Sequence, residues 1–307
     1  MLRIPTIRKI RESVNRREDD FRIRIGAMHV SQNRNIEGMI QDLWDLEVRV
    51  FSQWGEDGIL DYLFHRLEIS KPRILELGAG CFAECNSRFA AHLRNASVYA
   101  VDARNDLPMG IHKSGLMWRN NLNYEVIEID CENILDIVAR AEMAIDGIDI
   151  LSIDLDGNDY WLLEKIPLDQ VSIVVVEYNP IFGKDFKITV PNEKKSRFER
   201  HYSGLFFGAS LPAFIKLLDE KKFSFVGTNR VGNNAFFVRK QMADKCNVKL
   251  PHLDLLDKYV DWRCRDARNE HGVLTYDNMN VGRKVIEELL VVDVDTREKH
   301  KLKELGV

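Results

Sequence analysis

Apolar runs that alternate with helical patterns dominate the middle of the chain. Five of these runs are nearly continuous in Val, Ile and Leu, as expected of strands that are buried on both faces of a sheet. The predicted strands cover residues 73–78, 97–103, 124–130, 148–154 and 171–179. The segments between them carry apolar residues at helical spacing. This alternation predicts an α/β fold with a doubly wound parallel sheet.

The last two apolar runs, at 223–230 and 234–240, have no helix between them. So short a connection allows only an antiparallel hairpin. Together with the five parallel strands and a predicted helix at 209–222, this hairpin completes a doubly wound seven-stranded sheet. We therefore expect one main domain over residues 51–240 with a terminal antiparallel hairpin.

Two charged segments flank this domain. Residues 1–50 are rich in Arg and place Ile7, Ile10 and Val14 at a spacing that suits one face of a helix. We predict a helical N-terminal extension that packs on its own domain or on a neighbouring subunit. Contact of this basic helix with a membrane surface is a less favoured alternative. Residues 241–307 are predicted to form a helical C-terminal appendage that acts as a lid or as an oligomer contact.

Charge and composition restrict the class of partner and the cellular location that we expect. The 307 residues carry a formal charge of only -4, which does not point to nucleic acid. The five cysteines are scattered and odd in number, so we expect free thiols in a reducing cytoplasm. No apolar run approaches the roughly 20 residues of a membrane span, and the N-terminus lacks a signal-peptide core. We therefore expect a cytoplasmic protein.

Open α/β sheets bind ligands at the carboxyl ends of their strands. The first predicted strand runs into a G-x-G-x-x-A loop that contains Gly78 and Gly80, and the second ends at Asp102. Glycines let the backbone approach a ligand closely, and an acid about 20 residues on accepts hydrogen bonds from ribose hydroxyls. The pattern predicts an adenosine-containing ligand, either a nicotinamide dinucleotide or S-adenosylmethionine.

Two further acids favour S-adenosylmethionine. Glu76 lies in the mouth of the glycine loop, where its charge would repel a pyrophosphate but could hold the ammonium group of a methionine moiety. Asp130 ends the third predicted strand, where it could read an adenine amino group. The alternative for Asp130 is a place at the N-terminus of the following helix.

Several motifs in order resemble the class I S-adenosylmethionine-dependent methyltransferases: ILELGAG, YAVDA, EID, ILSIDLDGNDYW and GTNRVGNNAFFVR. FSQWGEDGIL at 51–60, together with IDLDG, resembles the FkbM-type methyltransferases, many of which modify sugars, polyketides or glycans. The resemblance covers about residues 51–240 and implies a Rossmann-like methyltransferase fold. The positions that it assigns to the cofactor or its entrance are Gln53, Glu56, Asp57, Glu76, Gly78, Gly80, Asp102 and Asp130. A helix start with Ser52 as its cap would also explain the SQWGEDG segment.

Acids also gather where the fourth and fifth strands are predicted to end. Asp154 and Asp156 follow the fourth strand and Glu177 ends the fifth. These three carboxylates are candidate ligands of a divalent cation such as Mg²⁺ or Mn²⁺, and Asp154 and Glu177 are candidate catalytic bases for a hydroxyl group. The D-x-D-G-N-D run is not an EF-hand loop, because Asp159 stands where the loop's glycine belongs and Lys165 where its closing Glu belongs. Asp159 is assigned to a helix start, and a cap of the same helix is the alternative for Asp156 or Asn158.

The 181–204 segment is predicted to be an insertion that covers the substrate. It contains His201, a third candidate base, and four cations that could bind a phosphorylated or acidic acceptor or could simply be solvated: Lys194, Lys195, Arg197 and Arg200. The expected substrate is a small molecule or glycan. The alternatives left open are a nicotinamide-dependent reductase or epimerase and a non-catalytic scaffold that binds the cofactor.

Overall fold

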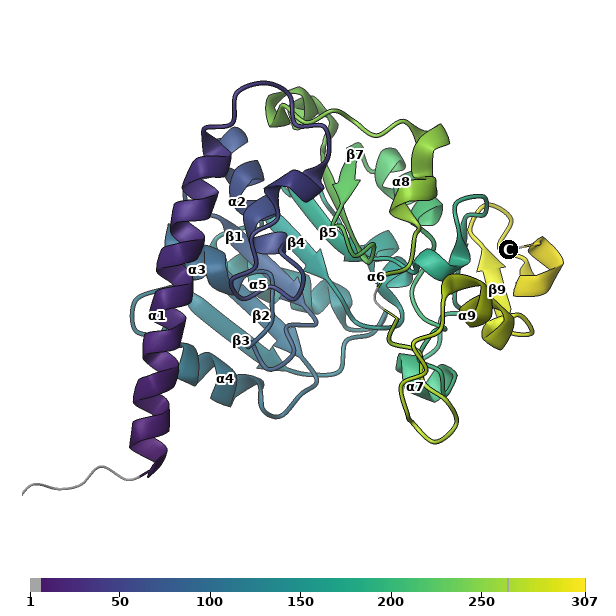
Figure 1. Cartoon of the computed structure of the whole chain (residues 1–307), viewed down its shortest axis with the longest axis horizontal. Helices are drawn as coiled ribbons and strands as arrows, with labels where there is room; N and C mark the ends of the chain where they lie inside the picture. Colours follow the sequence, from purple (N-terminus) through teal and green to yellow (C-terminus); the bar gives the residue numbers. More distant parts are fainter. Residues whose placement is uncertain (1–6, 264, 307) are drawn as a thin grey trace, which may run out of the picture.

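A seven-stranded mixed sheet forms the centre of the computed structural model, which describes residues 7–263 and 265–306 (Figure 1). The strand order is β3-β2-β1-β4-β5-β8-β7. The strands are β1 (Arg73–Leu77), β2 (Ser97–Asp102), β3 (Leu122–Val126), β4 (Ile150–Ile153), β5 (Ile173–Glu177), β7 (Phe223–Thr228) and β8 (Asn234–Arg239). Among these seven strands, β8 alone runs opposite to the other six. The predicted doubly wound sheet with a terminal hairpin is confirmed, and its order is the one expected of the class I methyltransferase fold.

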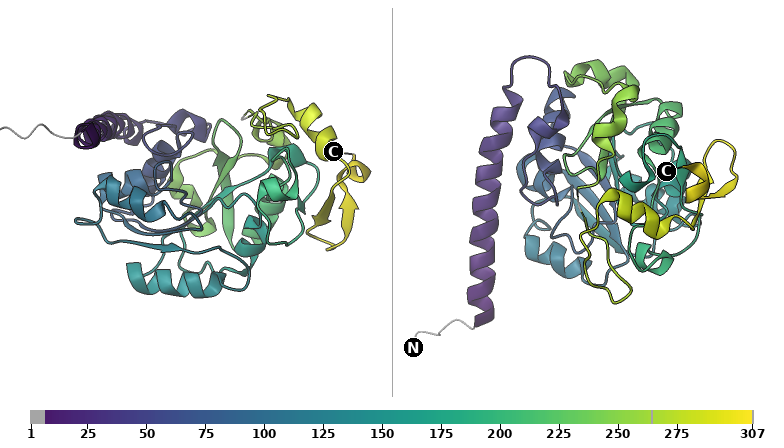
Figure 2. Two further views of the ribbon diagram at one scale, coloured as in Figure 1. Left: turned by 90° about the horizontal axis from the view of Figure 1, so that it is seen from below. Right: turned by 45° about the vertical axis from the view of Figure 1, so that its right-hand side comes forward.

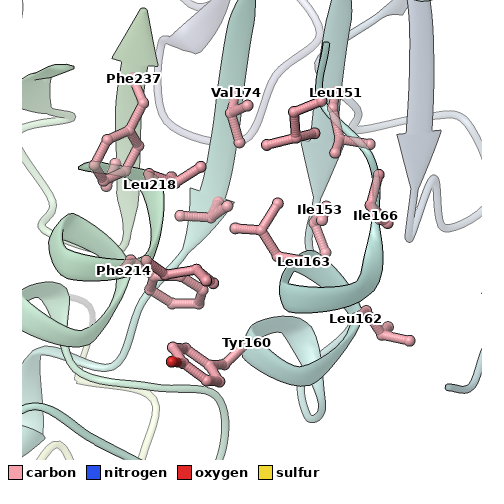
Figure 3. Packing of buried hydrophobic residues seen from close by; sticks show 14 of the residues in the cluster. Leu151, Ile153, Tyr160, Leu162, Leu163, Ile166, Val174, Phe214, Leu218 and Phe237 are labelled. Carbon is pink, nitrogen blue, oxygen red and sulfur yellow. The ribbon is translucent and has the colours of Figure 1, made fainter. Parts of the chain in front are cut away.

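Helices cover both faces of this sheet. They are α2 (Glu56–Arg66), α3 (Arg88–Arg94), α4 (Leu107–Ser114), α5 (Ile134–Ile145), α6 (Asp159–Lys165) and α8 (Leu211–Glu220). Side chains of β5 alternate between two apolar clusters, with Val174 in the cluster of α5, α6 and α8 and Val175 in the cluster of α2. Figure 3 shows the first cluster, in which Leu163 and Phe214 pack beside Val174. Burial on both faces explains the continuous apolar runs of the central strands.

The third strand differs from its prediction. β3 ends at Val126 rather than at Asp130, so Asp130 lies in the loop that leads to α5. β3 is the edge strand of the sheet, and its Tyr124 and Val126 are exposed. A half-buried edge strand has a weaker apolar pattern than a central one, which is why its end was misplaced.

The N-terminal extension contains one long helix, α1 (Ile7–Arg34), which lies along α2 and α3 (Figure 2). Gly26 lets it pack closely, because a Cβ there would lie 2.3 Å from Val50 Cγ2. Val14 is exposed, and the side chains of Ile7 and Ile10 lie outside the described residues. Within the described part of the chain, no helix has the length and apolar character needed to cross a membrane.

The C-terminal segment is only partly helical, which corrects the prediction. It contains α9 (Met279–Ile286) and two strands, β9 (Leu290–Asp293) and β10 (Lys299–Lys301). β9 pairs with β10 and with β6 (Ile188–Thr189), which belongs to the 181–204 insertion. This pairing joins segments about a hundred residues apart, so no local sequence pattern could predict it. Short elements complete the chain: η1 (Leu43–Leu46), η2 (Pro180–Phe182), α7 (Arg197–Arg200), η3 (Lys240–Cys246), η4 (Leu253–Tyr259) and η5 (Leu302–Leu305).

Candidate functional site

The glycine loop after β1 has a shape that only glycine allows at its first position. Gly78 has φ +91, and a Cβ there would lie 1.7 Å from the backbone oxygen of Asp154. The amide groups of Gly78 and Ala79 both donate to Val101 O, at 2.9 and 3.2 Å. Gly80 also has a positive φ of +56, but no atom lies within 4 Å of a Cβ built on it. The loop is therefore pressed against β4 at Gly78 and opens at Gly80.

Asp102, at the end of β2, closes one side of this loop. Its Oδ2 accepts the Gly80 amide hydrogen at 2.7 Å and its Oδ1 accepts the Arg104 amide hydrogen at 2.8 Å. The side chain is half-buried. A carboxylate offers about four lone-pair positions, so roughly two remain for a ligand. Contact of Asp102 with ribose hydroxyls stays a prediction.

Glu76 is held in place by backbone amide groups, and its contact with a methionine moiety stays a prediction. Its carboxylate is buried and accepts backbone amide hydrogens from Asn86 at 2.6 Å and Ser87 at 3.1 Å. Burial raises the pKa of Glu76. The side chain fixes the loop between β1 and α3, and the structure gives no contact that points it toward the mouth of the glycine loop.

The SQWGEDG segment forms the start of α2. Asp57 Oδ2 accepts three backbone amide hydrogens, from Val50, Phe51 and Ser52, at 2.7–2.9 Å. Ser52 Oγ in turn accepts the Asp57 amide hydrogen at 3.0 Å. Gln53 is exposed. The helix-start interpretation therefore accounts for Ser52 and Asp57 without a ligand.

Glu56 is buried in a polar network that the sequence analysis did not predict. Its Oε1 accepts hydrogen bonds from the side-chain amides of Asn229 at 2.7 Å and Asn234 at 2.8 Å. These asparagines belong to the β7–β8 hairpin. The network ties the start of α2 to the end of the sheet, which gives Glu56 a structural role.

The predicted acid cluster is present at the ends of β4 and β5. One carboxylate oxygen from each of Asp154, Asp156 and Glu177 lies within 4.8 Å of the others. Glu177 is 7 % exposed, and its Oε2 has no hydrogen-bond partner among the described residues. Burial, and then the repulsion between these acids, raises the pKa of Asp154 and of Glu177 well above the usual range. Such a cluster is suited to hold either a proton or a cation.

Arg197 of the insertion neutralises one side of the cluster. Its guanidinium group donates to Asp156 Oδ1 at 2.9 Å and to Asp266 Oδ2 at 2.8 Å, and its Nε donates to Gly204 O at 2.7 Å. It also lies over the Phe207 ring, 4.3 Å from the centroid. Asp266 comes from the C-terminal segment and was missed by the sequence analysis. The insertion and the C-terminal segment therefore meet at the acid cluster.

Asp159 holds the loop that carries the first two acids. It is fully buried and accepts the amide hydrogens of Leu155 at 2.8 Å and Gly157 at 3.1 Å. α6 begins at this residue. The assignment of Asp159 to a helix start is confirmed.

Two predicted site residues make other contacts. His201 is half-buried, hydrogen-bonds through Nδ1 to Ser203 Oγ at 2.8 Å and stacks on Tyr202. Burial lowers the pKa of His201. Asp130 accepts the amide hydrogens of Glu132 and Asn133, as a residue at the start of a helix does, and pairs with Lys194 at 2.5 Å. None of these contacts links His201 or Asp130 to the three acids.

The remaining cations of the insertion are also engaged within the protein. Lys195 pairs with Glu193 at 2.8 Å. Arg200 donates to Asn158 Oδ1 and to the carbonyl oxygens of Pro191, Glu193 and Lys195. An acidic acceptor would have to displace these partners.

Comparison with solved structures finds distant similarities. The chain is similar to coclaurine N-methyltransferase in a crystal structure with N-methylheliamine and SAH, at 14% sequence identity and a TM-score of 0.33, over 73% of each chain. No protein-family model matches the chain, and no curated protein matches it.

Proposed function

We propose that this protein is an S-adenosylmethionine-dependent methyltransferase that methylates a hydroxyl group. The observation that carries the proposal is the contact between the glycine loop and the acid cluster, where the Asp154 carbonyl occupies the space beside Gly78. The loop is suited to an adenosine-containing ligand, and the acids are suited to a polar acceptor. Their contact would bring donor and acceptor together at the carboxyl edge of the sheet, where such folds bind ligands.

The residues around the loop fit the cofactor. A Cβ on Gly80 would meet only open space, and Asp102 keeps lone pairs for ribose hydroxyls. When bound, S-adenosylmethionine supplies a methyl group on a sulfonium. The protein would then hold the acceptor oxygen in line with that group, and such positioning contributes up to ~7–11 kcal/mol in well-oriented reactions.

The acid cluster would handle the proton of the acceptor hydroxyl. A carboxylate whose pKa is raised is a stronger base than an ordinary one, which favours Asp154 or Glu177 over an exposed acid. His201 is a weaker candidate, because burial lowers its pKa and its hydrogen bond goes to Ser203 rather than to the acid cluster.

A divalent cation is a second way to use the same acids. The three oxygen ligands and the unpartnered Glu177 Oε2, within the described chain, fit a hard cation such as Mg²⁺ or Mn²⁺. Asp154, Asp156 and Glu177 would hold it, and Asp156 would have to share or release Arg197. Such a cation would orient the acceptor oxygens and lower the pKa of the hydroxyl.

For the finer assignment we propose an FkbM-like enzyme that acts on a sugar, glycan or secondary metabolite. This rests on the SQWGEDG and IDLDG motifs. Because the insertion cations are bound by protein oxygens, the proposal does not require a phosphate on the acceptor.

Calorimetric titration tests the cofactor. We expect S-adenosylhomocysteine to bind and NAD⁺ and NADH not to bind, with and without Mg²⁺ or Mn²⁺. Binding of NAD⁺ or NADH alone would favour the reductase or epimerase and overturn the proposal.

Turnover on a panel of hydroxylated sugars tests the chemistry. We expect Glu177→Gln to keep its affinity for S-adenosylhomocysteine and to lose methyl transfer. Glu142→Gln, on an exposed face of α5, is the matched control. Cofactor binding without transfer by the unaltered protein on the whole panel would favour a non-catalytic scaffold.

A further inference from the structure

A cleft of about 720 Å³ lies at the opposite end of β1 from the glycine loop. It is lined mainly by the last turn of α2 and the segment that leads into β1, residues 64–70. The end of α3 contributes Arg94 and the short helix η3 contributes Lys245. Nothing in the proposed methyl transfer uses this cleft.

Positive charge exceeds negative charge around it. Arg66, Arg94 and Lys245 line the cleft, whereas Glu68 is the one acid among its lining residues. Next to the residues that line the cleft, the buried Asp61 forms ion pairs with two guanidinium groups, that of Arg34 at 2.7 Å and that of Arg94 at 2.6 Å. One carboxylate therefore balances two cations.

Arg66 and Lys245 keep free donors. Arg66 donates from Nε to the backbone oxygen of Lys245 at 3.0 Å, and both of its terminal nitrogens are without an acceptor among the described residues. Lys245 Nζ likewise has no partner within the described chain. The simplest alternative, that Arg66 only caps the end of α2, does not fit, because its bond goes to η3 rather than to a carbonyl of α2.

The pKa of His65 is consistent with this excess of positive charge around the cleft. Partial burial, followed by the nearby charges of Arg34 and Arg94, lowers the pKa of this exposed imidazole. Arg66 acts in the same direction, and only Asp61 opposes it. A bound anion would therefore raise the pKa of His65.

We propose that this cleft binds a phosphate-bearing ligand through Arg66 and Lys245. Guanidinium and ammonium donors that line the same open cleft suit phosphate oxygens. Two sources share this chemistry, a soluble phosphate compound and the headgroup of an anionic lipid. The inference does not depend on the methyltransferase proposal.

Calorimetry with inorganic pyrophosphate and flotation with phosphatidylcholine vesicles that contain phosphatidylserine test the two sources. We expect the unaltered protein to bind at least one of these probes and Arg66→Gln/Lys245→Gln to bind it at least about tenfold more weakly, since a hydrogen bond to a charged group is worth about 1.5–3 kcal/mol. Binding should also weaken as salt is added. Arg24→Gln/Lys113→Gln removes the same charge from exposed positions elsewhere and is the matched control.

Either probe alone would sustain the proposal and identify the source. The proposal is overturned if neither probe binds, or if both double variants bind as the unaltered protein does. A second readout needs no variant: we expect the pKa of His65, followed by NMR, to rise when the bound probe is present. An unchanged pKa with the probe bound would place the probe elsewhere and also overturn the proposal.

Discussion

The Asp154 carbonyl oxygen lies where a side chain on Gly78 would have to be, 1.7 Å from a Cβ built there. This contact sets the distance between the glycine loop of β1 and the acids that follow β4. The Asp154 amide group also donates to Leu77 O at 2.9 Å, so the two strand ends are joined on both sides of the contact. The glycine loop and the backbone of Asp154 are therefore held together at two points.

Alanine at the two glycines should separate packing from ligand contact. We expect Gly78→Ala to lose both stability and S-adenosylhomocysteine binding, because the Cβ would displace β4. Gly80→Ala should cost only about 1–2 kcal/mol of unfolding free energy, from its positive φ, yet should still weaken cofactor binding. Gly115→Ala, with φ +69 and open space around it, is the control that should lose similar stability with unchanged affinity. Equal affinities for Gly80→Ala and Gly115→Ala would contradict cofactor contact at Gly80.

Glu177 should make the protein less stable as the pH rises. Its pKa is raised in the folded state, so the folded chain binds this proton more tightly than the unfolded chain does. The stability that it contributes is complete below its ordinary pKa, about 4, and is lost as the pH rises through the raised value. We expect Glu177→Gln to be more stable than the unaltered protein at neutral pH, with a flatter pH profile in urea unfolding. If the unfolding free energy of Glu177→Gln depended on pH as steeply as that of Glu142→Gln, the raised pKa of Glu177 would be contradicted.

Arg197 should compete with a divalent cation for Asp156. We expect Arg197→Gln to bind Mn²⁺ about tenfold more tightly, since one hydrogen bond to a charged group is worth about 1.5 kcal/mol. Titration followed by electron paramagnetic resonance measures this affinity. Arg200→Gln is the control, because its partners are carbonyl oxygens and Asn158 rather than the acids. Unchanged Mn²⁺ affinity in Arg197→Gln would show that Asp156 is not a ligand.

Asp57 should matter for folding rather than for chemistry. Asp57→Ala would leave three buried amide groups without their acceptor, so we expect a loss of about 3 kcal/mol or more in unfolding free energy. The exposed Asp169→Ala should lose little. Thermal and urea unfolding measure the difference. If Asp57→Ala were as stable as Asp169→Ala and lost only cofactor affinity, the segment would have a ligand role instead.

The location of much of the site could be predicted from the sequence, but the role of each acid in it could not. Asp102, Asp154 and Glu177 follow predicted strands, and strand ends meet at one edge of a parallel sheet, so their neighbourhood was predictable. Glu76 and Asp57 occupy equally suggestive positions, yet their oxygens are taken by backbone amide groups. A sequence shows that an acid is present but not which donors the folded backbone turns toward it.

The sequence by itself determined the class of sheet, because continuous apolar runs, glycine turns and a helix-free hairpin are local patterns that predict buried parallel strands with a terminal antiparallel pair. Only the tertiary structure decided what surrounds the acid cluster. Arg197 reaches Asp266, 69 residues away, and β6 pairs with β9 across about a hundred residues of chain. Such contacts depend on how distant segments pack against each other. Residues so far apart in the chain share no local sequence pattern from which the contact could be predicted.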